Sequence, residues 1–498
     1  MDSFPPPSKV MLSGFMVWVL LSAWDVAVGQ LHADSSPMDE AERDALFSAI
    51  RGFVGDGWNG SDLYPDPCGW TPIQGVSCDL YNGLWYITAL TVGPVHDNSL
   101  VCSENPVFAP QLFELARLKS LSLYSCFVQQ KADPVSIPLR GWERIVDTIE
   151  SLEFRSNPGL VGQLPSGISL LQRLDSLVVL DNGLNGDLPS SLTNLTRLRR
   201  LVLSWNSFTG SIPSEYGRLT ELLILDLSGN SLSGPLPPSL GNLTSLLKLD
   251  LSNNRRLSGH LPEQLNNLRN LTLLDLRDNN LTGGLPRTTF EGMVSLKGML
   301  LSNNPLGGGL EDIAWENLKR LEILDLDNLR LTGTIPKSIS CLESLRYLGL
   351  GNNNLTGTLP ADEISSLSGI NTVHVNGNDL IGELKFPEWF YRKLGARFSA
   401  WNNPNLCYPT ELTSKGVQPN GVSPCRSPDS GEEEINGNSK ARLDDRDGEV
   451  GWSSSNSRSK PDDAPSSSSG SLSYLGYYTR ELEVVVMLGL ALVVLWEW

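Results

Sequence analysis

The stretch LTLLDLRDNNLTGGLP, from Leu271 to Pro286, sets the pattern of most of the chain. Aligned on its asparagine, Asn279, the template LxxLxLxxNxLxGxLP recurs at intervals of 24 or 25 residues. In two further copies Cys126 and Leu329 replace the asparagine. The other repeats place it at Asn157, Asn182, Asn206, Asn230, Asn254, Asn304, Asn353, Asn378 and Asn403.

The leucine spacing predicts how one repeat folds. Leu274 and Leu276 alternate with Asp275 and Arg277, so the leucines point to one side of a short strand and the charged residues to the other. One repeat is too short to bury its leucines alone, so neighbours must stack around a shared core. We therefore predict an α/β leucine-rich repeat solenoid with a parallel concave β-sheet, formed by about twelve repeats over residues 83–403.

The asparagines should form a ladder inside the bend after each strand, where their amides satisfy backbone groups. At Leu329 two interpretations remain: the adjacent Asn328 takes over this role, or the ladder has a gap.

The segment after each asparagine identifies a subtype. LNGDLP, FTGSIP, LSGPLP, LSGHLP, LTGGLP, LTGTIP and LTGTLP each combine a turn-forming glycine with a proline that keeps the backbone extended. From Leu118 to Leu384 this pattern resembles the plant-specific leucine-rich repeat class of receptor kinases, receptor-like proteins and polygalacturonase inhibitors.

The two ends resemble the disulfide-bonded caps of that class. Residues 39–82 contain an amphipathic helix pattern followed by Trp58, DPCGW and GVSC, and residues 404–425 contain PNLCYP and SPC. The resemblance implies disulfides between Cys68 and Cys78 and between Cys407 and Cys425. Cys126 either pairs with Cys102 or fills the asparagine position as a small buried residue. Cys341 is then the expected free thiol.

Targeting segments predict secretion and membrane attachment. Residues 1–29 read as a signal peptide, because a lysine precedes a short apolar run. Residues 426–481 form an acidic, serine-rich linker expected to be disordered. Residues 482–498 fit a removable signal for a glycosylphosphatidylinositol anchor, with a marginal transmembrane anchor and a fully secreted product as alternatives. In a secreted chain the sequons predict glycosylation at Asn59, Asn194, Asn242, Asn270, Asn280 and Asn354.

Composition and motifs argue against several functional classes. The formal net charge of −18 disfavours nucleic-acid binding. The four histidines have no partner at a metal-binding or nucleophile–base spacing, and the cysteines form no zinc pairs. We therefore predict a protein that is not an enzyme and that has no cofactor and no metal.

The concave face is the predicted binding surface. Residues that alternate with the buried leucines align in columns, and the middle column, from Glu153 to His374, is rich in aspartate. These acids either meet a basic ligand or belong to the habitual LDLS strand of the repeat class. Trp205 has no scaffold purpose, and such aromatic anchors dominate binding energies. The candidate ligand-binding residues are Arg200, Trp205, Asp226, Asp250, Asp275, Arg277, Asp325 and Tyr347.

A closer resemblance concerns the N-terminal cap, the segment FELARLKSLSLYSCF and the absence of a kinase signature. Together these resemble the Piriformospora indica-insensitive protein 2 group, which implies a plasma-membrane protein that responds to a root-colonising fungus. We expect recognition of an extracellular peptide, glycan or receptor ectodomain through the concave face, with signalling through a partner receptor kinase. The alternatives are an inhibitor of microbial wall-degrading enzymes, like the polygalacturonase inhibitors, and a structural wall protein.

Overall fold

The computed structural model describes residues 37–95, 97–128 and 134–426. The predicted signal peptide, nearly all of the predicted linker and the predicted anchor lie outside these residues. Residues up to Pro424 belong to one compact unit, and Cys425 begins a second. A search of the described residues finds no helix with the length and apolar character needed to cross a membrane.

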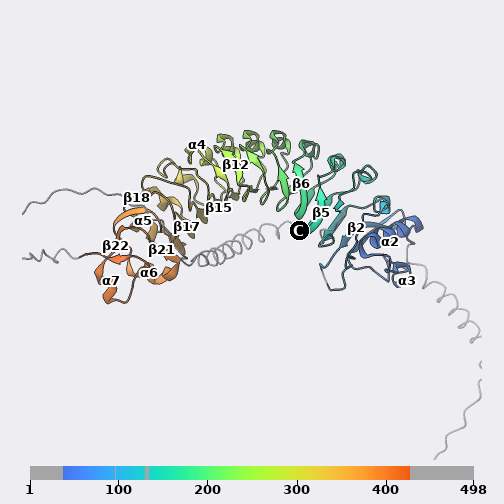
Figure 1. The fold of residues 1–498 in the computed structure, drawn as a ribbon, viewed down its shortest axis with the longest axis horizontal. Helices are drawn as coiled ribbons and strands as arrows, with labels where there is room; N and C mark the ends of the chain where they lie inside the picture. The colour runs from blue at the N-terminus through green and yellow to red at the C-terminus, as the bar shows by residue number, and fades with distance from the viewer. Residues whose placement is uncertain (1–36, 96, 129–133, 427–498) are drawn as a thin grey trace, which may run out of the picture. The chain divides into compact units, whose positions relative to one another are not determined.

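Within the described residues, one sheet of 16 strands runs through the repeats (Figure 1). It begins with β1 (Val76–Tyr81), which pairs antiparallel to β2 (Leu84–Val92), and every later pairing is parallel. The later strands along the sheet, in spatial order, are β3 (Ser120–Tyr124), β5 (Ser151–Gly162), β6 (Ser176–Asp187), β7 (Arg200–Val202), β9 (Ile224–Asp226), β11 (Lys248–Asp250), β13 (Leu273–Asp275), β15 (Gly298–Leu300), β16 (Ile323–Asp325), β17 (Tyr347–Gly349), β19 (Thr372–His374) and β21 (Phe398–Ser399). Two short strands lie off this path: β4 (Val135–Ser136) pairs with β5, and β8 (Ser207–Thr209) pairs with β6.

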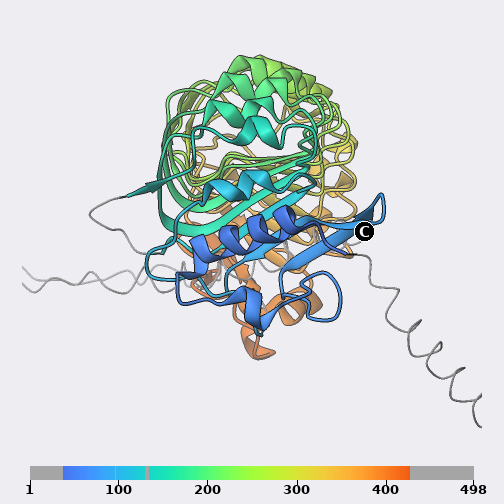
Figure 2. The same ribbon diagram turned by 90° about the vertical axis from the view of Figure 1, so that its right-hand side faces the viewer.

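A single helical turn lies opposite the sheet in most repeats, and the successive turns follow one another along the curve of the solenoid (Figure 2). In most repeats the proline of the LP pair precedes this turn, because its fixed φ holds the backbone extended up to the first helical residue. The turns are η1 (Pro110–Glu114), η2 (Trp142–Arg144), η3 (Ser166–Leu170), η4 (Ser190–Asn194), η5 (Ser214–Arg218), η6 (Pro238–Asn242), η7 (Glu263–Asn267), α4 (Arg287–Phe290), η8 (Trp315–Asn317), η9 (Lys337–Cys341) and α5 (Ala361–Ser365).

Two small parallel sheets follow the bends, where the LxGxLP segments suggested a second short strand. The first contains β10 (Ser233–Gly234), β12 (Arg256–Gly259) and β14 (Asn280–Leu281). The second contains β18 (Thr356–Gly357), β20 (Asp379–Glu383), β22 (Asn405–Tyr408) and β23 (Ser423–Pro424).

The asparagine ladder is present, and Asn254 shows how it works. Its side chain is fully buried, and its Nδ2 donates to the carbonyl oxygens of Leu227, Leu251 and Ser252 at 3.0–3.2 Å. Its Oδ1 accepts the backbone N–H of Leu232 at 3.1 Å. One side chain therefore satisfies backbone groups of two successive repeats.

The structure decides between the two interpretations of Leu329. Leu329 is fully buried, whereas Asn328 is exposed and donates to Asn303 Oδ1 at 2.9 Å. Asn353 Oδ1 accepts the N–H groups of both Leu329 and Leu331. The ladder therefore has a gap at Leu329, and Asn328 does not fill it.

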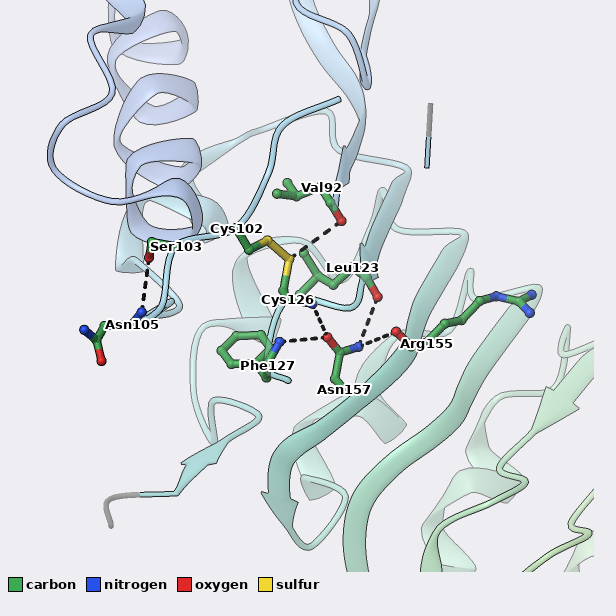
Figure 3. The surroundings of a disulfide bond; sticks show 9 residues. All are labelled: Val92, Cys102, Ser103, Asn105, Leu123, Cys126, Phe127, Arg155 and Asn157. Carbon is green, nitrogen blue, oxygen red and sulfur yellow. Dashed lines mark hydrogen bonds between the residues drawn. A yellow bond between two sulfur atoms is a disulfide. The ribbon is translucent and has the colours of Figure 1, made fainter. Parts of the chain in front are cut away.

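Cys126 combines both of the roles considered for it (Figure 3). It is disulfide-bonded to Cys102, and its N–H donates to Asn157 Oδ1 at 2.8 Å, as a ladder residue should. Its Sγ lies 3.8 Å from the carbonyl oxygen of Val92. Because a disulfide sulfur has no hydrogen to donate, the cystine replaces the asparagine by packing and cross-linking.

The predicted disulfide of the N-terminal cap is confirmed, and both cysteines of the C-terminal cap are oxidised. Cys68 bonds to Cys78, and both Cys407 and Cys425 are disulfide-bonded. Cys341 is the free cysteine among the described residues, as expected.

Apolar caps close the ends of the core. At the N-terminal end, α2 (Glu40–Val54) buries Leu46, Ala49 and Phe53, and α3 (Gly60–Leu63) follows it. The buried carboxylate of Glu42 accepts the N–H groups of Ile87 and Ala116, both at 3.2 Å, which ties α2 to the first turns of the solenoid.

At the C-terminal end, α6 (Glu388–Leu394), η10 (Gly395–Arg397) and α7 (Thr410–Ser414) cover the last repeats. Phe386, Phe390, Tyr391 and Phe398 form an aromatic cluster with ring centroids 4.3–6.2 Å apart. Each open end of the core thus receives an apolar cover, as a solenoid requires.

Replacing Asn254 with alanine should destabilise the solenoid. The change leaves buried carbonyl groups and one buried N–H without partners, which should lower the free energy of unfolding by about 2–3 kcal/mol. Chemical denaturation of purified protein measures this. The exposed Asn420→Ala variant serves as the control and should shift it by less than about 0.5 kcal/mol. A loss for Asn254→Ala no larger than that of the control would contradict the proposed role of the ladder.

Candidate functional site

The concave face carries the residue columns that the sequence predicted. In the register, Glu153 pairs with Val178, and the column continues through Asp226, Asp250 and Asp275. It then passes through Leu300, Asp325, Gly349 and His374. The flanking leucines belong to the buried core, so the column residues lie on the opposite face of the sheet.

The column is less open than the sequence suggested. Asp226, Asp275 and Asp325 are only 9%, 3% and 6% exposed. Neighbouring strands are about 4.8 Å apart, so the side chains of adjacent repeats cover one another. The aspartates form the floor of the face and do not project freely from it.

A central charged strip is built from Asp226, Asp250, Asp275, Lys248 and Arg277. Lys248 Nζ lies 2.9 Å from Asp226 Oδ2 and 3.2 Å from Asp250 Oδ2, so one cation bridges two repeats. Arg277 donates from Nε and Nη2 to the Asp275 carboxylate, the shortest contact being 2.6 Å. The charges of these three carboxylates are thus partly neutralised.

The strip continues into the carboxylates of Asp325 and Asp327, which have hydrogen-bond donors but, in the part of the chain that the structure describes, no salt bridge. Asp325 accepts the Ser302 hydroxyl at 2.7 Å, and Asp327 accepts the N–H of Gly351. Among the described residues, no lysine or arginine forms a salt bridge with either. Burial and the neighbouring Asp325 raise the pKa of Asp327 to about 8.

The pKa of Asp250 is also raised. Burial, together with Asp275 and Asp226, raises its pKa to about 7, and the ion pair with Lys248 offsets this only in part. Burial also raises the pKa of Asp325. Part of the strip therefore binds protons at a mildly acidic pH and becomes more negative as the pH rises.

A second group lies nearer the N-terminal end, on β3, β5 and β7. Glu153 accepts the Tyr124 hydroxyl at 2.7 Å and Arg155 Nε at 3.1 Å, and Arg200 Nη1 lies 4.0 Å from it. Burial opposes the ionisation of Glu153, but the contacts with Tyr124 and Arg155 lower its pKa. Two guanidinium groups share this one carboxylate, so the group has an excess of positive charge.

A third group lies on β17 and β19, near the C-terminal end. The Tyr347 hydroxyl is 3.2 Å from His374 Nδ1, and the two rings meet edge to face. Burial lowers the pKa of His374 to about 4, so this imidazole is neutral at physiological pH.

The structure places the predicted residues in three separate groups. Asp226, Asp250, Asp275 and Arg277 lie together and Asp325 extends their strip, whereas Arg200 and Tyr347 belong to the groups on either side. Trp205 lies just after β7, exposed at the end of the strand. The six predicted glycosylation asparagines are all exposed.

Sequence reasoning missed Tyr124 and the way in which Lys248 bridges two repeats. It also missed the serines whose hydroxyls donate to the aspartates, which are Ser228, Ser252 and Ser302. Tyr124 stands two residues before Cys126, as Arg155 stands two residues before Asn157, so the alignment of the repeats contained that signal. The bridging by Lys248 depends on a contact between repeats, which no alignment of a single repeat reveals.

Comparisons with known proteins agree with this architecture. A leucine-rich repeat family model matches residues 244–306, and a second matches residues 197–219, 221–243, 320–342 and 344–366. Piriformospora indica-insensitive protein 2 of Arabidopsis thaliana is 57% identical over 152 residues, which cover 30% of this chain and 35% of that protein. Receptor like protein 29 of Arabidopsis thaliana is 32% identical over 183 residues, which cover 36% and 37%.

Solved structures with the same fold include receptor ectodomains. The plant peptide hormone receptor RGFR1 in complex with RGF2 is 26% identical with a TM-score of 0.52, over 64% of this chain and 52% of that one. A TDR receptor is 29% identical with a TM-score of 0.53, over 62% and 51%. The PEPR1–AtPEP1 structure is 25% identical with a TM-score of 0.57, over 76% and 54%.

The repeats, the ladder and the curved sheet define this chain as a leucine-rich repeat protein. Over about a third of its length it is similar to plant leucine-rich repeat proteins, one of which is named as a receptor like protein. The chain spans about a third of the curated relatives it matches and about half of the receptor structures.

The raised pKa values predict that stability falls as the pH rises. From about pH 5 up to the folded pKa of each group, about 7 for Asp250 and about 8 for Asp327, the folded state holds a proton that the unfolded chain has already released. As the pH rises through that window, each such proton makes the free energy of unfolding fall by roughly 1.4 kcal/mol per pH unit. Thermal unfolding at several pH values measures this slope.

Asp327→Asn should flatten that slope, because asparagine keeps an oxygen for the Gly351 N–H without a titrating charge. The gain in melting temperature over the parent protein should be larger at pH 8 than at pH 5. An equal gain at both pH values, or a parent protein that becomes more stable toward pH 8, would contradict the assignment.

Proposed function

We propose that this protein is a cell-surface recognition protein that binds an extracellular partner through its concave face and signals with a partner receptor kinase. The observation that carries the proposal is the central strip, where the parallel register aligns Asp226, Asp250, Asp275 and Asp325 in one column. Asp327 follows Asp325 two residues further along the same repeat. These five carboxylates have two paired cations, Lys248 and Arg277. Four of these aspartates also accept the backbone N–H two residues further along. These bonds need no excess of negative charge, and burying unbalanced carboxylates is unfavourable.

Charge favours a basic polypeptide as the partner. A lysine or arginine near Asp325 and Asp327 would lower the pKa of both carboxylates and gain two ionised acceptors. RGFR1 is named as a plant peptide hormone receptor, which supports a peptide over a glycan.

Cell-surface attachment is part of the same proposal. The predicted signal peptide, residues 1–29, directs the chain to the cell exterior, and residues 482–498 supply a lipid anchor or a short membrane anchor. A role in the response to root fungi rests on the similarity to Piriformospora indica-insensitive protein 2 alone.

The proposal can be tested on intact plant cells that carry the full chain with an internal tag. Treatment with phosphatidylinositol-specific phospholipase C should release the protein, and a receptor kinase should co-purify from untreated cells after stimulation. Surface protein that never co-purifies with a receptor kinase under any stimulus would argue against the signalling part.

The second candidate function is inhibition of microbial wall-degrading enzymes. The repeat class, shared with polygalacturonase inhibitors, favours it. Purified protein added to a fungal pectinase distinguishes the two functions, because strong inhibition at near-stoichiometric amounts would favour the inhibitor.

The charged strip should select basic peptides. For a fluorescent octa-arginine probe, the double variant Asp325→Asn and Asp327→Asn should weaken binding at pH 7.5 by about tenfold, as expected for loss of one charged contact of about 1.4 kcal/mol. Binding to the parent protein should strengthen from pH 5 to 8, because the carboxylates ionise.

The control removes the same charge elsewhere, with Asp312→Asn and Glu411→Gln, both exposed and outside the concave strands. Equal losses for the two double variants would mean that the probe responds to net charge, and the strip would then not be the binding site.

A further inference from the structure

Trp205 occupies a backbone position that tryptophan does not favour. In twelve successive repeats the residue before the ladder position has a positive φ, between 48° and 66°. Short polar residues and glycine tolerate this left-handed conformation, whereas a bulky side chain is strained in it. The other eleven residues are Ser125, Ser156, Asp181, Gly229, Asn253, Asp278, Asn303, Asn328, Asn352, Gly377 and Asn402.

The strain does not serve the core, because the Trp205 side chain is 55% exposed. Strained residues persist where the surroundings hold them, and they cluster at binding sites. An exposed aromatic ring in such a position points to a contact with another molecule.

The indole of Trp205 packs against Gly229 of the next repeat. A Cβ atom added to Gly229 would lie 2.7–3.1 Å from Cδ2, Cε3 and Cε2 of Trp205. Three ring atoms at similar distances mean that the face of the ring, not its edge, rests on Gly229. The glycine therefore makes room for the tryptophan and holds it in one orientation, with the opposite face directed away from Gly229.

Unpartnered polar atoms gather around the same repeat. Among the described residues, Ser176 Oγ, Arg200 Nε and Asn206 Oδ1 are buried and have no hydrogen-bond partner. Ser176 and Arg200 are paired in the sheet register. Asn206 is an exception in the ladder, because the N–H of Asn182 bonds to the carbonyl oxygen of Trp205 and not to the Asn206 amide.

The floor beside these atoms is apolar. Val178 and Val202 are buried, yet they lie on the concave side and outside the hydrophobic core. An extended polypeptide matches this surface, because its carbonyl groups suit the exposed part of the Arg200 guanidinium and its apolar side chains suit the exposed face of the Trp205 indole. A sugar ring also stacks on an indole, but a neutral glycan brings no cation to the acidic strip, so the strip favours a polypeptide.

We propose that Trp205 and Arg200 bind an apolar side chain and the adjacent backbone of an extended polypeptide that crosses the strands toward the acidic strip. This inference rests on the proposed function and specifies the ligand. Five strand spacings separate β7 from β16, which is about 24 Å at 4.8 Å each. An extended chain covers that distance in about seven residues. The ligand should therefore carry an apolar residue about seven positions from a lysine or arginine.

The test uses the full chain and synthetic glycine–serine peptides, each with one leucine and two adjacent arginines. Leucine and arginine are separated by about three, five, seven or nine residues, which brackets the distance along the face. Fluorescence anisotropy should show the tightest binding near seven, and Trp205→Ala should weaken binding of that peptide by about tenfold or more.

A second variant displaces the indole without removing it. Gly229→Asn places at this position the residue that several other repeats tolerate there, and its side chain would collide with the ring. It should weaken binding as Trp205→Ala does.

Gly284→Asn is the backbone control, because Gly284 also has a positive φ but has open space around its Cβ position. Trp389→Ala removes another half-exposed tryptophan, on α6. Neither control should change binding. The two glycine variants should lower the melting temperature by similar amounts, because both add a side chain at a positive φ, so a loss of binding confined to Gly229→Asn reports on the indole.

The outcomes separate this inference from the proposed function. If the double variant at Asp325 and Asp327 weakens peptide binding but Trp205→Ala and Gly229→Asn do not, the role of Trp205 is wrong and concave-face recognition stands. If none of these variants matters, both fail. If the Trp205→Ala variant unfolds, peptide binding by the Gly229→Asn variant tests the role of the indole instead: unchanged binding would contradict that role. Trp205-dependent binding of a neutral cello-oligosaccharide, without peptide binding, would assign the ring to a glycan and overturn the inference.

Discussion

Burial of each repeat's leucines by the next repeat is the interaction on which the rest of this structure depends. Leu249 and Leu251 are fully buried, although a lone repeat has too few residues to cover them. Each buried leucine contributes roughly 1.5–3 kcal/mol, provided that the neighbouring turn is in place. The same stacking brings Asn254 to the backbone of the preceding repeat, so the polar ladder and the apolar core form together.

Strict repetition makes the exceptions informative. At Leu329 an apolar side chain replaces a ladder amide, and Asn353 takes over two backbone N–H groups. At Cys126 a disulfide to Cys102 takes the position of the ladder amide and links the two segments covalently. Both exceptions preserve the solenoid. Trp205 differs, since it strains the backbone, remains exposed and requires a glycine in the next repeat. The first two exceptions have structural explanations, whereas for Trp205 we propose contact with a binding partner.

The parallel sheet also controls the electrostatics of the concave face. Strands in register bring like residues side by side, so aspartates that are far apart in the sequence become close neighbours. Their burial by one another raises the pKa of Asp250 and Asp327, although Lys248 and Arg277 neutralise part of the charge. The face therefore becomes more anionic as the pH rises, which suits a basic partner.

The sequence by itself determined the period, the strands, the ladder positions and the membership of each column, because these follow from local spacing that the repeats share. The capping disulfides followed from the resemblance of the two ends to a known class of repeat proteins. It also singled out Trp205, since an aromatic residue stands out against a regular template. Only the tertiary structure decided that Asn328 leaves the gap at Leu329 open, that Lys248 bridges two aspartates and that Gly229 supports the indole. Each of these depends on contacts between neighbouring repeats, and such contacts exist only after the chain has stacked.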